Sequence, residues 1–321
     1  MVDSSSGRVA EAKRHFWLVD FLIRLVKEKP LGTVGGIITL LLLLTGIFAD
    51  LAWLGLPEVG LAPYGMNECW VGGFLDPPSA NFWLGTDNVG RDLLSRVIYG
   101  ARISVIVGLT ASTLATAIST LIGVVSGYMG GKVDLAVQRG VDAWMCLPGL
   151  VVIILLVSVM GASLWTIIVA LGIGWGIGGS RIIRGAVIAI RENVYVQAAK
   201  AIGCPTHRIL TRHIVPNVTA TIIILFTVRV PGIILAEASL SFLGFGIPPP
   251  VPSWGGMLSG SGRAYMMMSP WLAIWPGLAL AITVYAVNMF GDAVRDIADP
   301  RMRGGAGRYG VRKLRKEAIK K

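Results

Sequence analysis

The sequence has few charged residues for its length. Only 15% of its 321 residues are Asp, Glu, Lys or Arg, whereas 54% are hydrophobic and the mean hydropathy is +0.69. An ordinary soluble domain has about 25% charged residues. The composition therefore excludes an ordinary soluble domain and predicts a chain whose solvent is the lipid bilayer.

Residues that carry catalytic or metal chemistry are also scarce. The three histidines, His15, His207 and His213, form no HExxH pair, which an intramembrane zinc protease would need. No GxxxxGK[ST] loop for nucleotide phosphates occurs, and the nearest segment, 127–132, has the wrong spacing. We therefore expect a chain that is not an enzyme, holds no metal or other cofactor and does not hydrolyse ATP itself.

Cysteine is equally rare. Cys69, Cys146 and Cys204 show no CxxC spacing, which argues against a metal site. In the topology derived below they fall in an outer loop, a membrane helix and an inner loop, so that no two of them could form a disulfide. The sequence does not identify a partner for Cys69, which alone faces the oxidising side.

What the sequence has instead is long apolar runs. A membrane-spanning helix needs about 20 mostly apolar residues. Six such runs with few or no charges occur, at 33–49, 104–128, 141–160, 164–180, 218–243 and 271–290. They predict an all-α, polytopic membrane protein with about six transmembrane helices. The first run is no cleavable signal peptide, because about thirty residues precede it and no small-residue cleavage site follows.

The segment before the first run leaves two alternatives open. Residues 15–27 mix aromatic and aliphatic side chains with scattered charges. This pattern is typical of a helix lying in the membrane interface. It is equally consistent with a longer first membrane helix.

The placement of positive charge predicts the orientation. Of the 29 lysines and arginines, 24 fall in segments that lie on one side if the N-terminus is inside. The positive-inside rule then puts both termini in the cytoplasm of a multi-pass cell-membrane protein. The same asymmetry explains the net charge of +11 better than nucleic-acid binding does. We predict a cytoplasmic segment at 1–32, a transmembrane domain at 33–294 and a basic cytoplasmic tail at 295–321.

Three segments interrupt the apolar pattern. A long outer loop at about 50–103 is rich in Gly, Pro and Trp, and a basic inner loop covers about 181–216. A proline-rich outer segment at 246–270 is expected to cap the mouth of a cavity, because irregular backbone at membrane depth needs protein or water around it.

Glycines crowd the fourth apolar run. They are Gly172, Gly174, Gly176, Gly178 and Gly179. Overlapping small-xxx-small patterns of this kind indicate close helix packing. A phosphate-binding loop is the rival interpretation, but it needs a strand before it and a soluble helix after it.

Three charged residues lie within the predicted spans. Asp142, Arg229 and Glu237 are costly there and mark a cavity or a subunit interface. They are candidates for a translocation path, although each could instead pair with another charge. An ion- or proton-coupled secondary transporter is the alternative function, but such a carrier usually has more carboxylates at mid-depth and broken helices in matching halves.

The inner loop carries a spaced motif. Its segment 195–203 predicts a short helix ending at Gly203, and Pro216 is expected to stop the chain before the next span. The spacing resembles the EAA loop of ABC-importer permeases, which reads E-A-A, three residues, G, nine residues and I-x-L-P. The matches are Ala198, Ala199, Gly203 and Pro216, and the departures are Gln197 for Glu, His213 for Ile and Val215 for Leu.

Three further segments resemble the second, C-type permease subunit of dipeptide and oligopeptide importers. They are FWLGTDNVGRDLLSRVIYGARIS at 82–104, EASLSFLGFG at 237–246 with PSWG at 252–255, and NMFGDAVRD at 288–296 with DPR at 299–301. The resemblance covers about 31–303. Four motifs in the same order make it specific.

The resemblance implies a type I ABC-importer permease fold and a set of partners. These are a second permease subunit, two ATP-binding cassette subunits that bind ATP and Mg, and an extracytoplasmic substrate-binding protein. The cargo would be a peptide of the dipeptide or oligopeptide class, although similar permeases serve nickel, glutathione or oligosaccharides. The residues implied in coupling to the ATPase are Tyr195, Gln197, Ala198, Ala199, Gly203 and Pro216. The effect of Gln197 in place of Glu stays open.

Charged residues of the outer loop have two interpretations. Asp87, Arg91 and Asp92 could help to seat the binding protein or shape the vestibule. Alternatively, Thr86 and Asp87 cap a helix beginning near residue 88, and Arg91 pairs with Asp92 within the loop.

Overall fold

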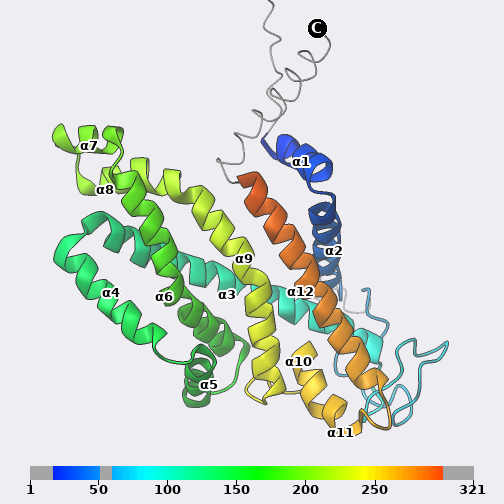
Figure 1. Cartoon of the computed structure of the whole chain (residues 1–321). Helices are drawn as coiled ribbons and strands as arrows, with labels where there is room; N and C mark the ends of the chain where they lie inside the picture. The colour runs from blue at the N-terminus through cyan, green and yellow to red at the C-terminus, as the bar shows by residue number, and fades with distance from the viewer. Residues whose placement is uncertain (1–16, 51–59, 299–321) are drawn as a thin grey trace, which may run out of the picture.

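Five long helices dominate the computed structural model, which describes residues 17–50 and 60–298 (Figure 1). They are α2 (Pro30–Ile47), α3 (Leu93–Met129), α6 (Leu164–Arg191), α9 (Val215–Phe242) and α12 (Trp271–Ala298). Each is long and apolar enough to cross a membrane. The bent pair α4 (Gly131–Met145) and α5 (Gly149–Met160) makes a sixth span if the two count as one. The predicted all-α architecture with about six spans is confirmed.

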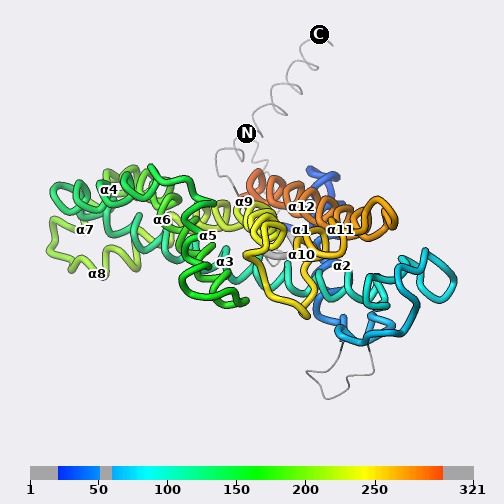
Figure 2. The backbone as a smooth tube through the Cα atoms, turned by 90° about the horizontal axis from the view of Figure 1, so that it is seen from below, coloured from blue at the N-terminus to red at the C-terminus, as the bar shows by residue number. Residues whose placement is uncertain are grey.

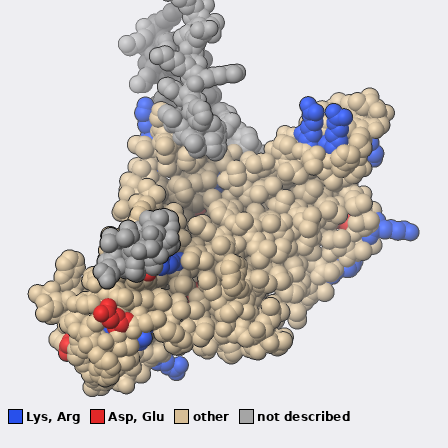
Figure 3. All heavy atoms as spheres, turned by 180° about the vertical axis from the view of Figure 1, so that it is seen from behind, with Lys and Arg blue, Asp and Glu red and all other residues tan. Residues whose placement is uncertain are grey.

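The short helices lie on two opposite sides of the molecule as drawn in Figure 1. On the upper side are α1 (Trp17–Glu28), α7 (Val194–Ala201) and α8 (Thr206–Ile209), with α7 and α8 far from α1 along the longer dimension that Figure 2 shows. On the lower side are the loop at 60–92, α10 (Trp254–Met257) and α11 (Arg263–Tyr265). Figure 3 shows a broad area with few charged atoms across the middle of one face, as expected of a surface that meets lipid.

Small residues bring α3 and α6 together. Gly123 of α3 lies against Ile183, and Gly176 of α6 lies against Ile118, so that a Cβ atom at either glycine would come within 2.8 Å of a side-chain atom across the interface. Gly172 similarly meets Leu114. The close-packing interpretation therefore holds for this interface, where backbones approach too closely for a methyl group.

A second seam of small residues joins α2 to α12. Gly32 lies against Ala293, and a Cβ atom at Gly35 would be 2.6 Å from the carbonyl oxygen of Ala286. An ion pair of 2.6 Å between Lys29 and Asp296 closes one end of the seam. Only 17% of α2 is buried inside the chain, so this narrow contact carries most of its packing.

The predicted single helix at 141–160 is wrong. The chain turns by 86° between Met145 and Gly149. Pro148 occupies the N-cap of α5 with extended backbone (φ −60°, ψ 114°) and has no N–H to continue α4. The run contains no charge between residues 143 and 160, so composition alone does not reveal the turn.

The predicted limits of both long loops are also wrong. The helix α3 begins at Leu93, so the outer loop ends at Asp92 and not near 103. The helix α6 continues to Arg191, so the inner loop is shorter than 181–216. In both cases arginines inside the helix were counted as loop residues, whereas they find partners: Arg102 donates to the Gly46 carbonyl at 2.8 Å, and Arg184 pairs with Asp134 at 2.5 Å.

The prediction that Pro216 interrupts the chain is wrong as well. The helix α8, the π-helical turn η2 (Leu210–Ile214) and α9 follow one another without a break. Pro216 lies in the first turn of α9, where a missing N–H is tolerated. The wider π turn before it accommodates the proline ring.

The segment before the first span forms a helix of its own. The helix α1 ends at Glu28, and α2 begins at Pro30. The alternative of one longer first helix is therefore not observed. His15 with the rest of residues 1–16, and the basic tail from residue 299 onward, lie outside the described residues.

Candidate functional site

The helix α7 ends in a capping motif that depends on glycine. The Cys204 N–H donates to the Ala199 carbonyl at 3.0 Å, and the Gly203 N–H donates to the Lys200 carbonyl at 3.1 Å. Gly203 has φ +78°, the left-handed conformation that this motif requires. The sequence pattern therefore placed the end of the helix correctly.

The two faces of α7 differ in what they contact. Val196 and Ala199 are buried in a cluster with Ile209 and Ile214, which fixes the helix to the end of the bundle. The opposite face and the end of the helix expose apolar side chains: Val194 is 84% exposed and Ile202 is 85% exposed. Exposed apolar residues gathered on a polar end of a protein indicate a surface for a partner.

The remaining predicted coupling residues lie at the same end. Tyr195 is half-exposed, with its ring centroid 6.2 Å from that of His213, and Ala198 is exposed. Gln197 donates from Nε2 to the Glu192 carbonyl at 3.2 Å, a bond that a glutamate could not donate. A groove of about 1020 Å³ runs beside α7 and is lined by polar residues that include Arg191, Gln197 and Lys200. The fold thus brings the coupling candidates of α7 and α9 to one end of the molecule.

The charged residues of the outer loop hold the loop together. Asp87 is 2% exposed and accepts hydrogen bonds from the N–H groups of Val89 and Arg91 and from Arg91 Nε at 2.7 Å. The guanidinium of Arg96 lies 3.6 Å from the same carboxylate. A carboxylate used this fully within the chain has little left for an external partner.

Asp92 caps the helix that follows. Its Oδ2 accepts from the Ser95 N–H at 2.8 Å and from the Ser95 hydroxyl at 2.7 Å, at the first turn of α3. Capping was predicted for Thr86 and Asp87, and pairing was predicted between Arg91 and Asp92. Both details are wrong: Asp92 is the cap and Asp87 is the partner of Arg91.

Arg229 lies buried in the middle of α9 without a carboxylate partner among the described residues. It is 4% exposed, and its Nη2 donates to Ser119 Oγ at 2.8 Å and to the Trp175 carbonyl at 2.9 Å. A longer contact of 3.4 Å joins Nη1 to Thr116 Oγ1. A charged residue at the centre of a membrane helix costs about 2.5–3.5 kcal/mol on insertion scales, so its presence calls for a functional reason.

Glu237 and Asp142 do not pair with Arg229. Glu237 is 1% exposed, and its Oε1 accepts from the Ser241 hydroxyl at 2.7 Å. Asp142 forms ion pairs with Arg181 of α6 and, at 3.5 Å, with Arg139. The structure therefore distributes the three charged candidates over separate places, and only Arg229 lines the cavity described next.

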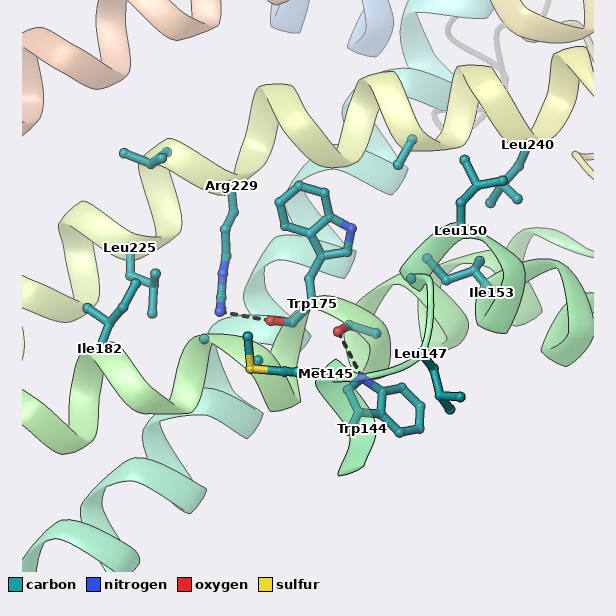
Figure 4. A pocket seen from close by; sticks show the side chains of 16 residues that line it. Trp144, Met145, Leu147, Leu150, Ile153, Trp175, Ile182, Leu225, Arg229 and Leu240 are labelled. Atoms are coloured by element: carbon teal, nitrogen blue, oxygen red, sulfur yellow. Dashed lines mark hydrogen bonds between the residues drawn. The ribbon is translucent and has the colours of Figure 1, made fainter. Parts of the chain in front are cut away.

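A cavity of about 610 Å³ lies between the α4–α5 bend, α6 and α9. Its walls are almost entirely apolar, with Trp144, Leu150, Trp175 and Leu240 among the lining residues. Figure 4 shows the Arg229 side chain extending from α9 toward α6, where its tip meets the Trp175 carbonyl. One cation in an apolar cavity is an arrangement that orients an anionic ligand.

Sequence reasoning missed several residues of these sites. Ser119 and Thr116 hold Arg229 from another helix, and no local pattern connects residues more than 100 positions apart. Asp134 was missed too, although it forms two hydrogen bonds with Arg184 at 2.6 and 2.5 Å and ties α4 to α6. The only sequence signal for Asp134 was its position in the first turn of a helix, shortly after the end of a predicted span.

No group of His, Cys, Asp or Glu that could hold a metal ion occurs in residues 17–50 and 60–298. Cys69, Cys146 and Cys204 are free thiols in the structure.

Comparison with known proteins connects these features. Residues 119–304 match the family described as the binding-protein-dependent transport system inner membrane component. The dipeptide transport system permease protein DppC of Bacillus subtilis is 42% identical over 71% of each chain. The oligopeptide transport system permease protein OppC of the same organism is 37% identical over 88% of this chain and 90% of its own. The glutathione transport system permease protein GsiD of Pectobacterium atrosepticum is 37% identical over 70% of this chain and 75% of its own.

A solved structure supports the fold. A chain of the MetNI methionine ABC transporter, solved in inward-facing conformations, superposes with a TM-score of 0.52 at 16% identity. The match covers 64% of this chain and 96% of that one. Because the family match spans more than half of the chain and its relatives align over most of it, this chain belongs to the inner membrane components of binding-protein-dependent transport systems.

Proposed function

We propose that this chain is a permease subunit of an ATP-driven importer of peptides of the dipeptide or oligopeptide class. It would form the translocation path together with a second permease subunit. The observation that carries the proposal is the exposure of apolar side chains on α7, Val194 at its start and Ile202 at its C-cap, while its other face is packed into the bundle. Relatives named for dipeptide and oligopeptide transport supply the cargo class.

The geometry of α7 suits the transmission of force from ATPase subunits. Val196 and Ala199 pack α7 against residues of α6 and α9, so that the short helix would move as one body with them. When a docked ATPase dimer closes, displacement of α7 would rock the helices and favour one of two states of the bundle. Two ATP-binding cassette subunits would hold the ATP and Mg that this chain has no motif to bind.

The remaining partners and the orientation belong to the same proposal. An extracytoplasmic substrate-binding protein would deliver the peptide to the end that carries the loop at 60–92. The basic residues around α7 and α1 favour the cytoplasm for the side of the membrane on which these two helices lie, and therefore for both termini of the chain. Lipid would surround α2, whose outer surface is apolar and exposed.

The test is uptake by the reconstituted importer. The chain is co-expressed with a second permease, ATPase and binding-protein subunits from the same organism and placed in vesicles with a labelled peptide. We expect uptake that requires ATP on the side of the vesicle membrane that carries the ATPase subunits. This uptake should persist after the proton gradient has collapsed. Uptake that survives ATP depletion and stops when the gradient collapses would instead support the secondary-transporter alternative.

A further inference from the structure

Two arginines are buried among the described residues, and they differ in whether a carboxylate lies beside them. Arg96 lies 3.6 Å from the carboxylate of Asp87. Arg229 forms hydrogen bonds only to two hydroxyl groups and one backbone carbonyl. These groups are neutral, so they orient the guanidinium without balancing its charge.

Arg229 also has N–H donors that form no hydrogen bond with a described residue. A guanidinium has five N–H groups, and the three contacts above use three of them. The Nε–H and one Nη1–H donate to no described residue. Each of these N–H groups can donate one charge-assisted hydrogen bond to an anion.

A second element that lines the cavity, the start of α5, also favours an anion. The helix α5 begins at Gly149, directly after the bend, and both Gly149 and Leu150 line the cavity. The Val151 N–H donates to the Pro148 carbonyl at 3.0 Å, whereas the N–H groups of Gly149 and Leu150 precede the first bonds of the helix and lie at the positive end of its dipole. Among the residues that the structure describes, none that lines the cavity is acidic. Two independent features of the cavity thus favour an anion within it.

The rest of the cavity has the size and character for the remainder of a short peptide. Its volume of about 610 Å³ lies within the usual range for small-molecule sites, about 300–1,000 Å³. Its aliphatic and indole walls can accommodate side chains of many kinds. Such a site would recognise the C-terminal carboxylate, which all peptides share, and tolerate the side chains, which differ between them.

We propose that Arg229 binds the C-terminal carboxylate of the peptide during its passage through the cavity. This inference rests on the proposed function as a peptide importer. It names the part of the peptide that the permease itself recognises. The competing source of a carboxylate is the second permease subunit, and the experiment separates the two.

The test is equilibrium binding of labelled trialanine and of trialanine amide to the purified complex of permeases and ATPases, without binding protein. We expect the wild-type complex to bind the free acid at least tenfold more tightly than the amide. In Arg229→Gln this preference should disappear through weaker binding of the acid, whereas Arg229→Lys, which keeps the charge, should retain a preference for the acid.

Gly179→Ala provides a variant that leaves the arginine in place. A methyl group at this position would overlap Arg229 Nη2 and lie 2.9 Å from Ser119 Oγ, so the guanidinium must move and the preference for the acid should fall. Gly185→Ala is the matched control on the same helix, because a Cβ atom there has no neighbour within 4 Å. Its preference should equal that of the wild type.

Three results would overturn the inference. They are equal binding of acid and amide by the wild type, binding of neither, or an equal loss of both in Arg229→Gln, as expected if Arg229 pairs with the second permease. Failure of the proposed function gives a different result. The wild-type importer, with its binding protein, would then hydrolyse ATP without taking up any peptide.

Discussion

The loop at 60–92 and the segment around α7 both interrupt the apolar pattern, at opposite ends of the molecule, and both expose apolar side chains, but they differ in their polar contacts. The outer loop buries the carboxylates of Asp87 and Asp92 almost fully and exposes Trp70 and Trp83. The α7 segment forms few polar contacts of its own and exposes apolar residues from a firmly packed helix. Charged residues in a loop can therefore serve the fold of the loop itself, as Asp87 and Asp92 do.

The largest effect is expected from Asp87→Ala in the outer loop. The substitution removes the acceptor of three hydrogen bonds and leaves Arg91 and Arg96 without their carboxylate. Breaking a buried ion pair by removing one partner costs about 3–5 kcal/mol. Thermal unfolding of the purified complex in detergent should show a marked fall in Tm.

The exposed Glu68 supplies the control for this variant. Glu68→Gln should change the free energy of unfolding by no more than about 0.5 kcal/mol, as is usual for surface positions. If Asp87→Ala unfolded at the same temperature as Glu68→Gln, the comparison between the two regions would fail. The outer carboxylates would then be free for another role.

An intermediate effect is expected from Ala199→Asp in α7. Ala199 is 9% exposed within an apolar cluster, so a carboxylate there has no partner and should destabilise the protein by about 2 kcal/mol or more. Ala198→Asp changes the neighbouring, exposed position. It should leave Tm unchanged and lower peptide uptake per ATP hydrolysed, measured in vesicles, at least tenfold. Full uptake by Ala198→Asp would show that this face of α7 meets no ATPase.

The smallest effect on the fold is expected at Gly203. A Cβ atom there meets nothing within 4 Å, so only the backbone conformation resists substitution. At φ +78°, valine should cost about 1–2 kcal/mol, and asparagine should cost less because it tolerates the left-handed region. Uptake per ATP should fall more for Gly203→Val than for Gly203→Asn. Equal losses in both variants would point to a clash with the partner and away from the capping motif.

Much of the fold could be predicted because a membrane-spanning helix has to meet only two requirements, a sufficient length and an apolar composition. The runs at 33–49, 164–180 and 271–290 each mark a helix of the structure, since length and apolar character suffice to identify a span. The end of α7 was also predictable, because Gly203 signals a left-handed cap from local sequence alone.

Other features depend on contacts that no local pattern records. Hydropathy measures composition and not direction, so the 86° turn at Pro148 was missed inside an uncharged run. The start of α3 was placed too late because Arg96 and Arg102 were counted as loop charges, although Asp87 and Asp50 pair with them. The importance of Arg229 was recognised, but its anchors on α3 and α6 became visible only in three dimensions.

The seam between α2 and α12 has a consequence for biogenesis. Among the described spans, α2 leaves the ribosome earliest and α12 latest, yet Gly32 and Gly35 of the former have their contacts on Ala293 and Ala286 of the latter. During synthesis the early span must wait in the bilayer, with its glycine face turned to lipid, until the late span arrives. A chain stalled before α12 would therefore expose an unfilled groove to membrane quality control, so that completion of synthesis and completion of the fold coincide.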